Sequence, residues 1–222
     1  MTRVVVKVGG NAAQAAAVHD LVSDLVASSH EIAVVHGAGP QITREMEQRG
    51  IPVEFVGGRR VTTAEGLEAV RGAFAAVNGV LCAALGSRAV PLFGDDIGLR
   101  ATRIPELGLV GDPLPSRPPA VEAALAAGLI PVVAPLAEGP LNVNADEAAA
   151  ALAIGLGANR LLFVTDVPGL LLEGAVVTAI DVDEAERVLP GLEGGIVPKL
   201  HAAVAAARLG VRAEIGETAV LA

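Results

Sequence analysis

Two lysines stand out in this sequence, because they are the only lysines among its sixteen lysine and arginine residues. Lys7 precedes a pair of glycines, and Lys199 follows a second pair of glycines and a proline. A compact ammonium group on a flexible side chain can follow a phosphoryl group as it moves, whereas the planar guanidinium of arginine is fitted to a fixed anion. The two lysines therefore predict a site where two point charges meet a phosphate. The alternative is a pair of solvated surface lysines.

Two glycine-containing turns follow segments that resemble strands and precede segments that resemble helices. Their sequences are KVGGN at residues 7–11 and HGAGP at residues 36–40. Glycines in such turns bring backbone N–H groups close to an anion, and the N-terminus of the following helix adds positive potential. The first turn is not a P-loop, because its lysine precedes the glycines. His36, at the end of a strand, is either a general base or a residue that orients the loop.

Three other segments place polar residues where ligands often bind. Arg59 and Arg60 are adjacent, so their side chains point in different directions and at most one is expected to hold a carboxylate. Asn142, Asn144 and Asp146 alternate with apolar residues, which would direct all three side chains to the same side of an extended segment. Asp146 is alternatively the N-cap of the next helix. The segment FVTDVPG at residues 163–169 is a strand running into a turn that suits a ribose or a phosphate.

Composition argues against several classes of protein. The chain has 222 residues, 52% of them hydrophobic, which is enough for one large domain or two lobes that share a core. The net charge of −9, the lack of a basic block and the presence of only four aromatic residues disfavour nucleic acid as a partner. One cysteine, Cys82, excludes an internal disulfide, suits a reducing cytoplasm and is expected to pack in the core. We expect neither a membrane span nor a signal peptide.

Short β-branched runs alternate with longer Ala-, Leu- and Glu-rich runs, which predicts an α/β fold with a mainly parallel open sheet between two layers of helices. Residues 94–119 are rich in Gly and Pro and are expected to form hairpins or a lid-like excursion. Residues 135–140 are the expected boundary between two lobes, 1–136 and 137–222. The expected strands are residues 4–8, 31–36, 52–56, 90–93, 130–134, 160–165, 176–180, 211–215 and 219–221. The expected helices are residues 12–28, 41–49, 63–85, 120–127, 146–156 and 198–209.

Six motifs, taken in order, resemble those of the amino acid kinase family over residues 3 to about 210. They are K-x-G-G, H-G-x-G-P, G-x-R-V-T, N-V-N-A-D, T-D-V-x-G and G-G-x-x-P-K; the ordered set is specific, although each motif alone is not. They are most similar to the members that use ATP to phosphorylate the γ-carboxylate of N-acetyl-L-glutamate, the second step of arginine biosynthesis. The resemblance implies a three-layer αβα fold, a substrate-binding N-lobe, a nucleotide-binding C-lobe, and Mg²⁺ carried by ATP without a metal site of its own.

The resemblance also implies a role for each matched residue. Lys7 and Lys199 would flank the transferred phosphoryl group, and Asp146 would hold both lysines. Arg60 would grip the substrate's α-carboxylate, and the substrate-binding set is Ala38, Gly39, Arg60, Asn142 and Asn144. Backbone donors around the phosphates would be Gly9, Gly10 and Gly37. The remaining nucleotide-binding residues would be Thr165, Asp166, Val167, Pro168, Gly169, Leu170, Leu171, Gly191, Leu192 and Glu193.

The sequence departs from the family pattern at three places. Ala38 replaces a glycine of the usual H-G-G-G, which requires a negative φ at this position. The C-terminal end is shorter than in the family, which puts nucleotide-side packing and turnover in question. A helical N-terminal extension of the kind linked to arginine-sensing hexamers is missing, so the expected state is a homodimer without arginine feedback.

Two alternatives remain open. The first is a kinase acting on carrier-protein-bound aminoadipate or glutamate, a group that tends to have R-Y-T where this chain has Val61 between Arg60 and Thr62. The second is a non-catalytic, ATP-binding regulatory homologue.

Overall fold

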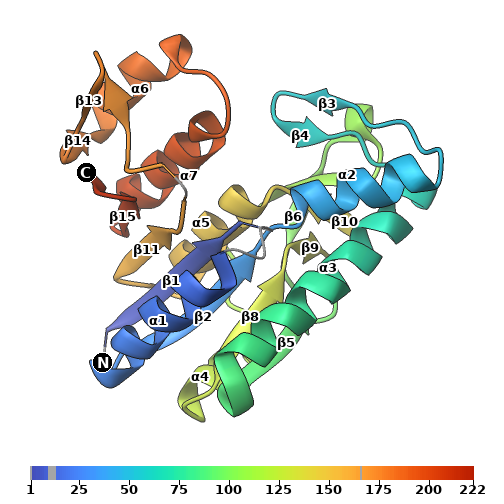
Figure 1. Ribbon diagram of the computed structural model, residues 1–222, viewed down its shortest axis with the longest axis horizontal. Helices are drawn as coiled ribbons and strands as arrows, with labels where there is room; N and C mark the ends of the chain where they lie inside the picture. The colour runs from blue at the N-terminus through green and yellow to red at the C-terminus, as the bar shows by residue number, and fades with distance from the viewer. Residues whose placement is uncertain (1, 10–13, 166) are drawn as a thin grey trace.

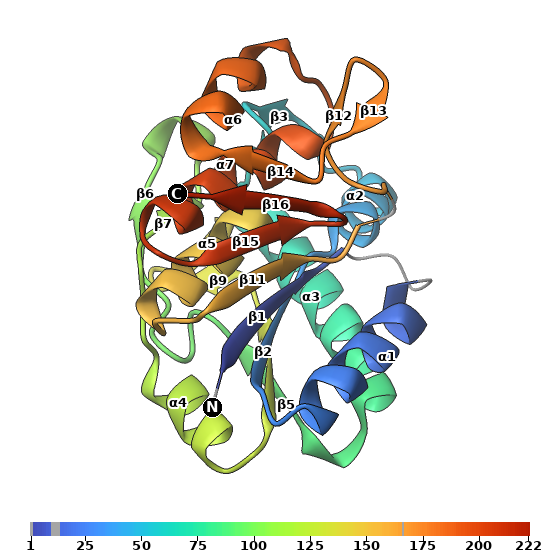
Figure 2. The same cartoon turned by 90° about the vertical axis from the view of Figure 1, so that its left-hand side faces the viewer.

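A computed structural model describes residues 2–9, 14–165 and 167–222, and its central element is an eight-stranded sheet (Figure 1). The strand order is β14-β16-β15-β11-β1-β2-β8-β5. Figure 2 shows the part of this sheet from β14 to β2, with the strands side by side. All neighbouring strands are parallel except β15 and β16. The mainly parallel sheet is therefore confirmed. The strands are β1 (Arg3–Val8), β2 (Glu31–His36), β5 (Ala89–Phe93), β8 (Ile130–Ala134), β11 (Arg160–Phe163), β14 (Ala179–Asp181), β15 (Arg212–Ile215) and β16 (Thr218–Leu221).

Helices cover both faces of this sheet, as the α/β pattern predicted. On one face lie α1 (Gln14–Ala27), α2 (Gly39–Gln48) and α3 (Ala64–Leu85). On the other lie α4 (Pro119–Ala126), α5 (Ala145–Gly155), α6 (Val182–Val188) and α7 (Ile196–Arg208). Each face of the sheet has its own core: the first core lies under α1, α2 and α3, and the second core lies under α4, α5, α6 and α7. Because successive side chains of a strand point to opposite faces, β1 contributes Val4 and Val6 to the first core and Val5 to the second core. The three layers are visible in Figure 2, with α1 and α3 on one side and α4, α5 and α7 on the other.

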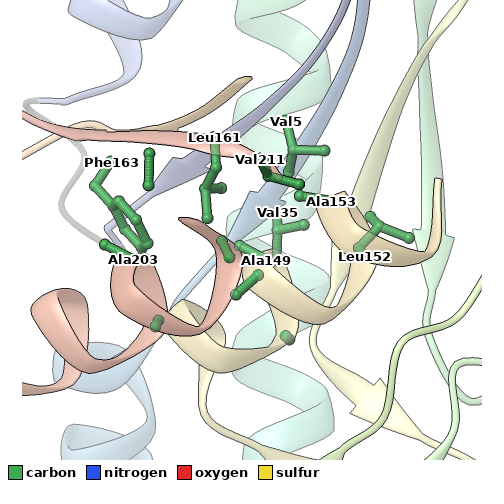
Figure 3. Packing of buried hydrophobic residues seen from close by; sticks show 14 of the residues in the cluster. Val5, Val35, Ala149, Leu152, Ala153, Leu161, Phe163, Ala203 and Val211 are labelled. Carbon is green, nitrogen blue, oxygen red and sulfur yellow. The ribbon is translucent and has the colours of Figure 1, made fainter. Parts of the chain in front are cut away.

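The second core is built around small residues where α5 and α7 meet the sheet (Figure 3). Ala149 and Ala153 of α5 and Ala203 of α7 are fully buried beside Leu161 and Phe163 of β11. Alanine side chains allow the backbones of two helices to approach closely. This packing places the first turns of α5 and α7 side by side, at the end of the sheet where β1 also ends.

Smaller sheets and hairpins surround this frame. A four-stranded sheet has the order β6-β7-β10-β9, formed by β6 (Ala101–Arg103), β7 (Val110–Pro113), β10 (Leu141–Val143) and β9 (Leu136–Ala137). The antiparallel pair β6–β7 confirms a hairpin within residues 94–119. Two further hairpins pair β3 (Phe55–Val56) with β4 (Arg59–Arg60), and β12 (Leu171–Leu172) with β13 (Ala175–Val176). Short 3₁₀ helices occupy Gly86–Arg88, Pro105–Leu107 and Leu189–Gly191.

Most predicted elements occur within a few residues of their expected bounds, and three elements differ. The strand expected at residues 176–180 is divided between β13 and β14, and only the last two residues of the stretch 52–56 pair with another strand. Helix α6 was missed, although Asp181 caps it by accepting a hydrogen bond from the Glu184 backbone N–H at 2.8 Å. An Asp followed three residues later by Glu is typical of a helix N-terminus. Residues 12 and 13 of the first expected helix lie outside the described residues.

Helix α3 is the longest in the described ranges. With its 3₁₀ extension it spans Ala64–Arg88, and by length and composition alone it is apolar enough to cross a membrane. Val70, Phe74 and Leu81 on its inner face are buried against the sheet. Cys82 lies on this helix, where its thiol donates to Asn78 Oδ1 at 3.2 Å and burial raises its pKa. Cys82 is half-buried and packs against the edge of the core, so the expected core position is only partly met.

Candidate active site

The carboxylate of Asp146 brings the two lysines together. Lys7 Nζ lies 2.9 Å from Asp146 Oδ1, and Lys199 Nζ lies 3.6 Å from the same oxygen. Lys7 is the penultimate residue of β1, Asp146 is in the first turn of α5, and Lys199 is in the first turn of α7. Lys7 and Asp146 are each only 5% exposed, so solvent and salt screen their charges weakly. The alternative of two separate surface lysines is therefore wrong.

The environment of Lys7 weakens its hold on its proton. Burial lowers the pKa of Lys7 below its usual value, Asp146 opposes that change, and the neighbouring Lys199 adds to it. The balance matters because two ammonium groups share a single carboxylate. One positive charge remains in excess at this point, and an anion such as a phosphate would neutralise it.

A cavity of about 300 Å³ opens beside Lys7 and Asp146. It collects most of the residues that the sequence assigned to substrate and phosphate binding. The predicted residues that line it are Lys7, Gly9, Gly37, Ala38, Gly39, Arg60, Asn142, Asn144 and Asp146. Sequence reasoning missed the apolar part of its wall, which includes Phe55, Phe74 and Val110. Side chains of this kind carry no motif that separates them from ordinary core residues.

Arg60 is buried in the wall of this cavity. Its Nη2 donates to the Gly39 carbonyl at 3.2 Å and to Thr43 Oγ1 at 2.8 Å, and its guanidinium lies 4.5 Å from the Phe55 ring centroid. Within the described ranges, no carboxylate forms an ion pair with it. Burial lowers its pKa, as expected for a cation away from water. A buried guanidinium without an anionic partner is suited to a ligand carboxylate.

Asn142 is oriented by a neighbour that the sequence did not single out. Its Nδ2 donates to Thr62 Oγ1 at 3.1 Å, and that hydroxyl donates to the Arg60 carbonyl at 2.9 Å. Thr62 is fully buried. Because the amide nitrogen is already bonded, the amide oxygen is the atom of Asn142 that remains to accept a hydrogen bond from a ligand.

The segment from Asn142 to Asp146 is not extended throughout, because α5 has begun before Asp146, but all three residues line the smaller cavity. Strand β10 ends at Val143, and α5 begins at Ala145. Asn144 is the N-cap, and its Oδ1 accepts from the backbone N–H groups of Asp146 at 2.9 Å and Glu147 at 3.3 Å. The capping role considered for Asp146 therefore belongs to Asn144, which leaves the Asp146 carboxylate free to bind the lysines.

The turn at residues 36–40 differs in part from its expected role. Ala38 has φ −148° and is buried, so its methyl group is accommodated without left-handed backbone strain. The Gly37 N–H donates to the Val8 carbonyl at 2.9 Å, in continuation of the β1–β2 ladder. Gly37 lines the cavity but its N–H is not available to a phosphate, which corrects the role inferred for it. Gly10, the neighbouring predicted donor, lies outside the described residues.

His36 has the environment of a residue that supports the loop. It is fully buried, its Nδ1 lies 3.3 Å from the Gly37 carbonyl, and its ring packs edge-on against Phe74 at 5.8 Å. Burial lowers its pKa to about 4. The residues that line the cavity do not include it. These observations favour the orienting role over a general base.

A second cavity, of about 460 Å³, begins at Lys199. Its walls are the two loops predicted to bind a nucleotide, with Thr165, Val167, Gly169, Leu170, Leu171, Leu192 and Glu193 from the predicted set and also Gly195 and Ile196. Pro168 and Gly191 do not line it, and Asp166 lies outside the described residues. Thr218 holds the loop that contains Leu170: its Oγ1 accepts from the Leu170 N–H at 2.8 Å and donates to the Val177 carbonyl at 2.6 Å.

Neither cavity contains an obvious metal site. Within residues 2–9, 14–165 and 167–222, no three His, Cys, Asp or Glu side chains gather closely enough to hold an ion. Asp146, the buried carboxylate nearest both cavities, is already shared by two lysines.

Known proteins are similar to this chain in both sequence and fold. A sequence profile of the amino acid kinase family matches residues 2–216. The acetylglutamate kinase of Rubrobacter xylanophilus is 44% identical, covering 97% of this chain and 88% of its own; that of Saccharopolyspora erythraea is 43% identical over 94% and 77%.

Solved structures agree with this assignment. The smu.665 protein of Streptococcus mutans superposes with a TM-score of 0.90 at 28% identity, covering 99% of this chain and 98% of its own. Carbamate kinase from Giardia lamblia bound to AMP-PNP has a TM-score of 0.74 over 99% and 98% of the two chains, and at 11% identity it supports the fold alone. Because the family profile matches almost the whole chain and a relative is 44% identical over 97% of it, the chain belongs to the amino acid kinase family.

Proposed function

We propose that this protein transfers the γ-phosphoryl group of ATP to the γ-carboxylate of N-acetyl-L-glutamate in arginine biosynthesis. The observation that carries the proposal is the ion-paired cluster of Lys7, Asp146 and Lys199 at the junction of two cavities. Relatives more than 40% identical over nearly the whole chain are named acetylglutamate kinases, which supports this acceptor over other members of the family.

The reaction needs no proton transfer to begin. The acceptor carboxylate is ionised at neutral pH, so one of its oxygens attacks the γ-phosphorus directly. A new P–O bond forms to the carboxylate as the bond to the β–γ bridging oxygen breaks, and ADP leaves with that electron pair. The absence of a general base from this scheme agrees with the buried position and low pKa of His36.

The main barrier is electrostatic, because a carboxylate must approach a polyphosphate. Lys7 lines the smaller cavity and Lys199 the larger one, so their ammonium groups lie on the two sides of the proposed transfer point. Fixed charges of this kind stabilise the charge that spreads over the transferred group. The negative charge of Asp146 offsets the repulsion between the two ammonium groups and so holds both in place before the substrates bind.

The smaller cavity has the polar groups that an acetylated amino acid requires. Arg60 supplies a buried cation for the α-carboxylate, and the amide oxygen of Asn142 supplies an acceptor for the acetamido N–H. The apolar surfaces of Phe74 and Val110 suit the methylene groups and the acetyl methyl. The larger cavity would hold the nucleotide, with Mg²⁺ bound to its phosphates; the separation into an acceptor half and a nucleotide half follows from this assignment.

ADP release in a coupled assay tests the proposed function. Wild-type protein with ATP and Mg²⁺ should turn over N-acetyl-L-glutamate at least about 100-fold more efficiently than L-glutamate or L-aspartate, because a site that bonds the acetamido group rejects analogues that lack it. Omitting Mg²⁺ tests the metal requirement in the same assay. Tight ATP binding without turnover of any acceptor would contradict the proposal and favour the regulatory alternative.

We also propose a homodimer in a reducing cytoplasm. Strand β5 is an edge of the large sheet. The adjacent helix α3 exposes Val80 beside several alanines, so this side of the protein has an apolar surface that a second copy could cover. Light scattering after size-exclusion chromatography distinguishes a dimer from a monomer.

The single cysteine agrees with a reducing compartment.

A further inference from the structure

The two adjacent arginines of β4 serve opposite sides of the β3–β4 hairpin. Arg60 bonds to α2, whereas Arg59 bonds to the first turn of α5, and both residues line the smaller cavity. Arg59 donates from Nε to Glu147 Oε2 at 3.1 Å and from Nη2 to Glu147 Oε1 at 2.8 Å. Its Nη2 also donates to Asp112 Oδ1, on β7, at 2.6 Å. One guanidinium therefore joins three elements that are distant in the sequence.

The contact with Glu147 is the more protected part of this arrangement. The side chains of Arg59 and Glu147 are 25% and 19% exposed, whereas that of Asp112 is 57% exposed. A two-pronged hydrogen bond between guanidinium and carboxylate fixes orientation as well as distance, and partial burial reduces its competition with water. The Arg59–Glu147 pair is thus the geometrically defining contact, with Asp112 as an outer partner.

Arg60 ties one side of the hairpin to α2 through Gly39 and Thr43, and the Arg59–Glu147 pair ties the other side to α5. Strands β3 and β4 have two residues each, and a hairpin of this size is not stable by itself. Phe55 and Val56 are 54% and 50% exposed, so burial of apolar surface contributes little at the tip. In the part of the chain that the structure describes, backbone bonds from the hairpin to the rest of the protein lie at its base, where Thr62 pairs with Leu107 and Leu109. In Figure 1 the hairpin projects beside α2 at the margin of the molecule.

Glu147 is also next to Asp146, the residue that holds the two lysines. Both lie in the first turn of α5, with Asn144 capping both backbone N–H groups. A hairpin attached to Glu147 is therefore attached to the same rigid turn that positions the lysine cluster. The distance between Arg60 and the two lysines must match the length of the acceptor. Because the hairpin and the lysines are both bonded to the first turn of α5, this turn sets that distance.

We propose that Arg59 is a positioning residue: through its ion pair with Glu147 it holds the β3–β4 hairpin on α5, so that Arg60 stays in register with the Lys7–Asp146–Lys199 cluster. The inference deepens the proposed function and rests on it. Arg59 also lines the smaller cavity. Because its guanidinium is already bonded to Glu147 and Asp112, we expect it to act on acceptor binding through the position of the hairpin. Its substitution should resemble a weak loss of Arg60 rather than a loss of phosphoryl transfer.

Steady-state kinetics of Arg59→Leu and Glu147→Gln test this positioning role. We expect KM for N-acetyl-L-glutamate to rise about fivefold or more in each, with kcat and KM for ATP changed less than about twofold, because a charge-assisted pair is lost but the phosphoryl site is intact. The double variant should be no worse than Arg59→Leu alone, since both changes remove the same contact. Arg117→Leu is the matched control, because it breaks an exposed pair with Glu122 at 2.7 Å that is remote from both cavities.

Hydrogen exchange provides a readout that does not depend on the substrate. The Val61 N–H, bonded to the Glu54 carbonyl at 3.0 Å, should exchange faster in Arg59→Leu than in wild type or Arg117→Leu. Unchanged exchange, or faster exchange with an unchanged KM for the acceptor, would overturn the positioning role. A wild-type protein without turnover of N-acetyl-L-glutamate would instead contradict the proposed function, and hydrogen exchange would then decide whether Arg59 anchors the hairpin.

Discussion

Lys7 and Lys199 approach the same oxygen of Asp146, at 2.9 and 3.6 Å, although they come from the first strand and the last helix of the fold. Lys7 reaches this point because β1 is a central strand of the parallel sheet and ends beside the start of α5. Lys199 reaches it because the alanine faces of α5 and α7 pack closely. The fold thus creates a local excess of positive charge in a protein whose net charge is −9.

This cluster predicts that neither lysine tolerates replacement by arginine. Lys7→Arg and Lys199→Arg keep the charge, but the planar guanidinium cannot follow the moving phosphoryl group from a site of this size. Each should lower kcat by at least ~100-fold, the scale of losing one preorganised charge donor. Calorimetry of ATP binding should show a much smaller change, and near-normal kcat in both variants would remove the lysines from the mechanism.

The lowered pKa of Lys7 predicts how the rate depends on pH. Catalysis requires Lys7 in its charged form, so kcat should fall as pH rises through the pKa of Lys7, which lies below the ordinary lysine value of 10.5. Asp146→Asn removes the attraction that holds the proton, and the pKa of Lys7 then falls further. The alkaline limb of the kcat profile should therefore move to lower pH in this variant, in addition to any loss of rate. Identical limbs in the two proteins would show that another group titrates.

The ordered motifs predicted the family, the three-layer architecture and half of the residues that line the smaller cavity, because these depend on periodicity and on residue type at strand ends. Asp146 was identified, although it lies in a helix and not in the extended segment that the sequence predicted. Asn144, two positions earlier, is the N-cap of the helix, and the sequence pattern does not fix the first residue of a helix this closely.

Contacts between distant segments were beyond the sequence. Arg59 and Glu147 are 88 positions apart, and nothing in either local pattern indicates that the two side chains meet. The role of Thr62 in orienting Asn142 was missed for the same reason, since 80 positions separate them. The bonded state of the Gly37 N–H likewise depends on the exact register of β1 and β2, which a glycine motif does not specify.

Arg60 should determine acceptor binding without affecting the nucleotide. Arg60→Lys keeps a positive charge but loses the planar fork, the hydrogen bonds to Gly39 and Thr43, and the stacking on Phe55. We expect KM for N-acetyl-L-glutamate to rise about tenfold or more, as for the loss of a charge-assisted pair with a carboxylate, while KM for ATP stays within about twofold.

Arg49→Lys provides a matched control for Arg60→Lys. Arg49 caps α2 and forms an exposed pair with Glu45, outside both cavities. This variant should keep wild-type kinetics. Equal effects of Arg60→Lys on the two Michaelis constants would indicate a general disturbance of the fold rather than loss of a carboxylate ligand.

The buried His36 predicts a specific loss of stability in acid. Its pKa is about 4 in the folded protein against an ordinary value of 6.5, so the unfolded chain binds more protons between these values. The contribution of a neutral His36 is complete above pH 6.5 and is lost as pH falls toward 4, with a total of about 3 kcal/mol in the free energy of unfolding. His36→Phe keeps a ring against Phe74 and removes the titration.

Urea unfolding of wild type and His36→Phe, at neutral pH and near pH 4.5, measures this contribution. Carboxylates titrate in both proteins, so the difference between the two acid-induced losses isolates His36. We expect wild type to lose about 2–3 kcal/mol more than the variant on acidification, because most of the shift lies within this range. Parallel losses would mean that the imidazole is already charged, or reaches solvent, in the folded protein, and the orienting role assigned to it beside Gly37 would then need another basis.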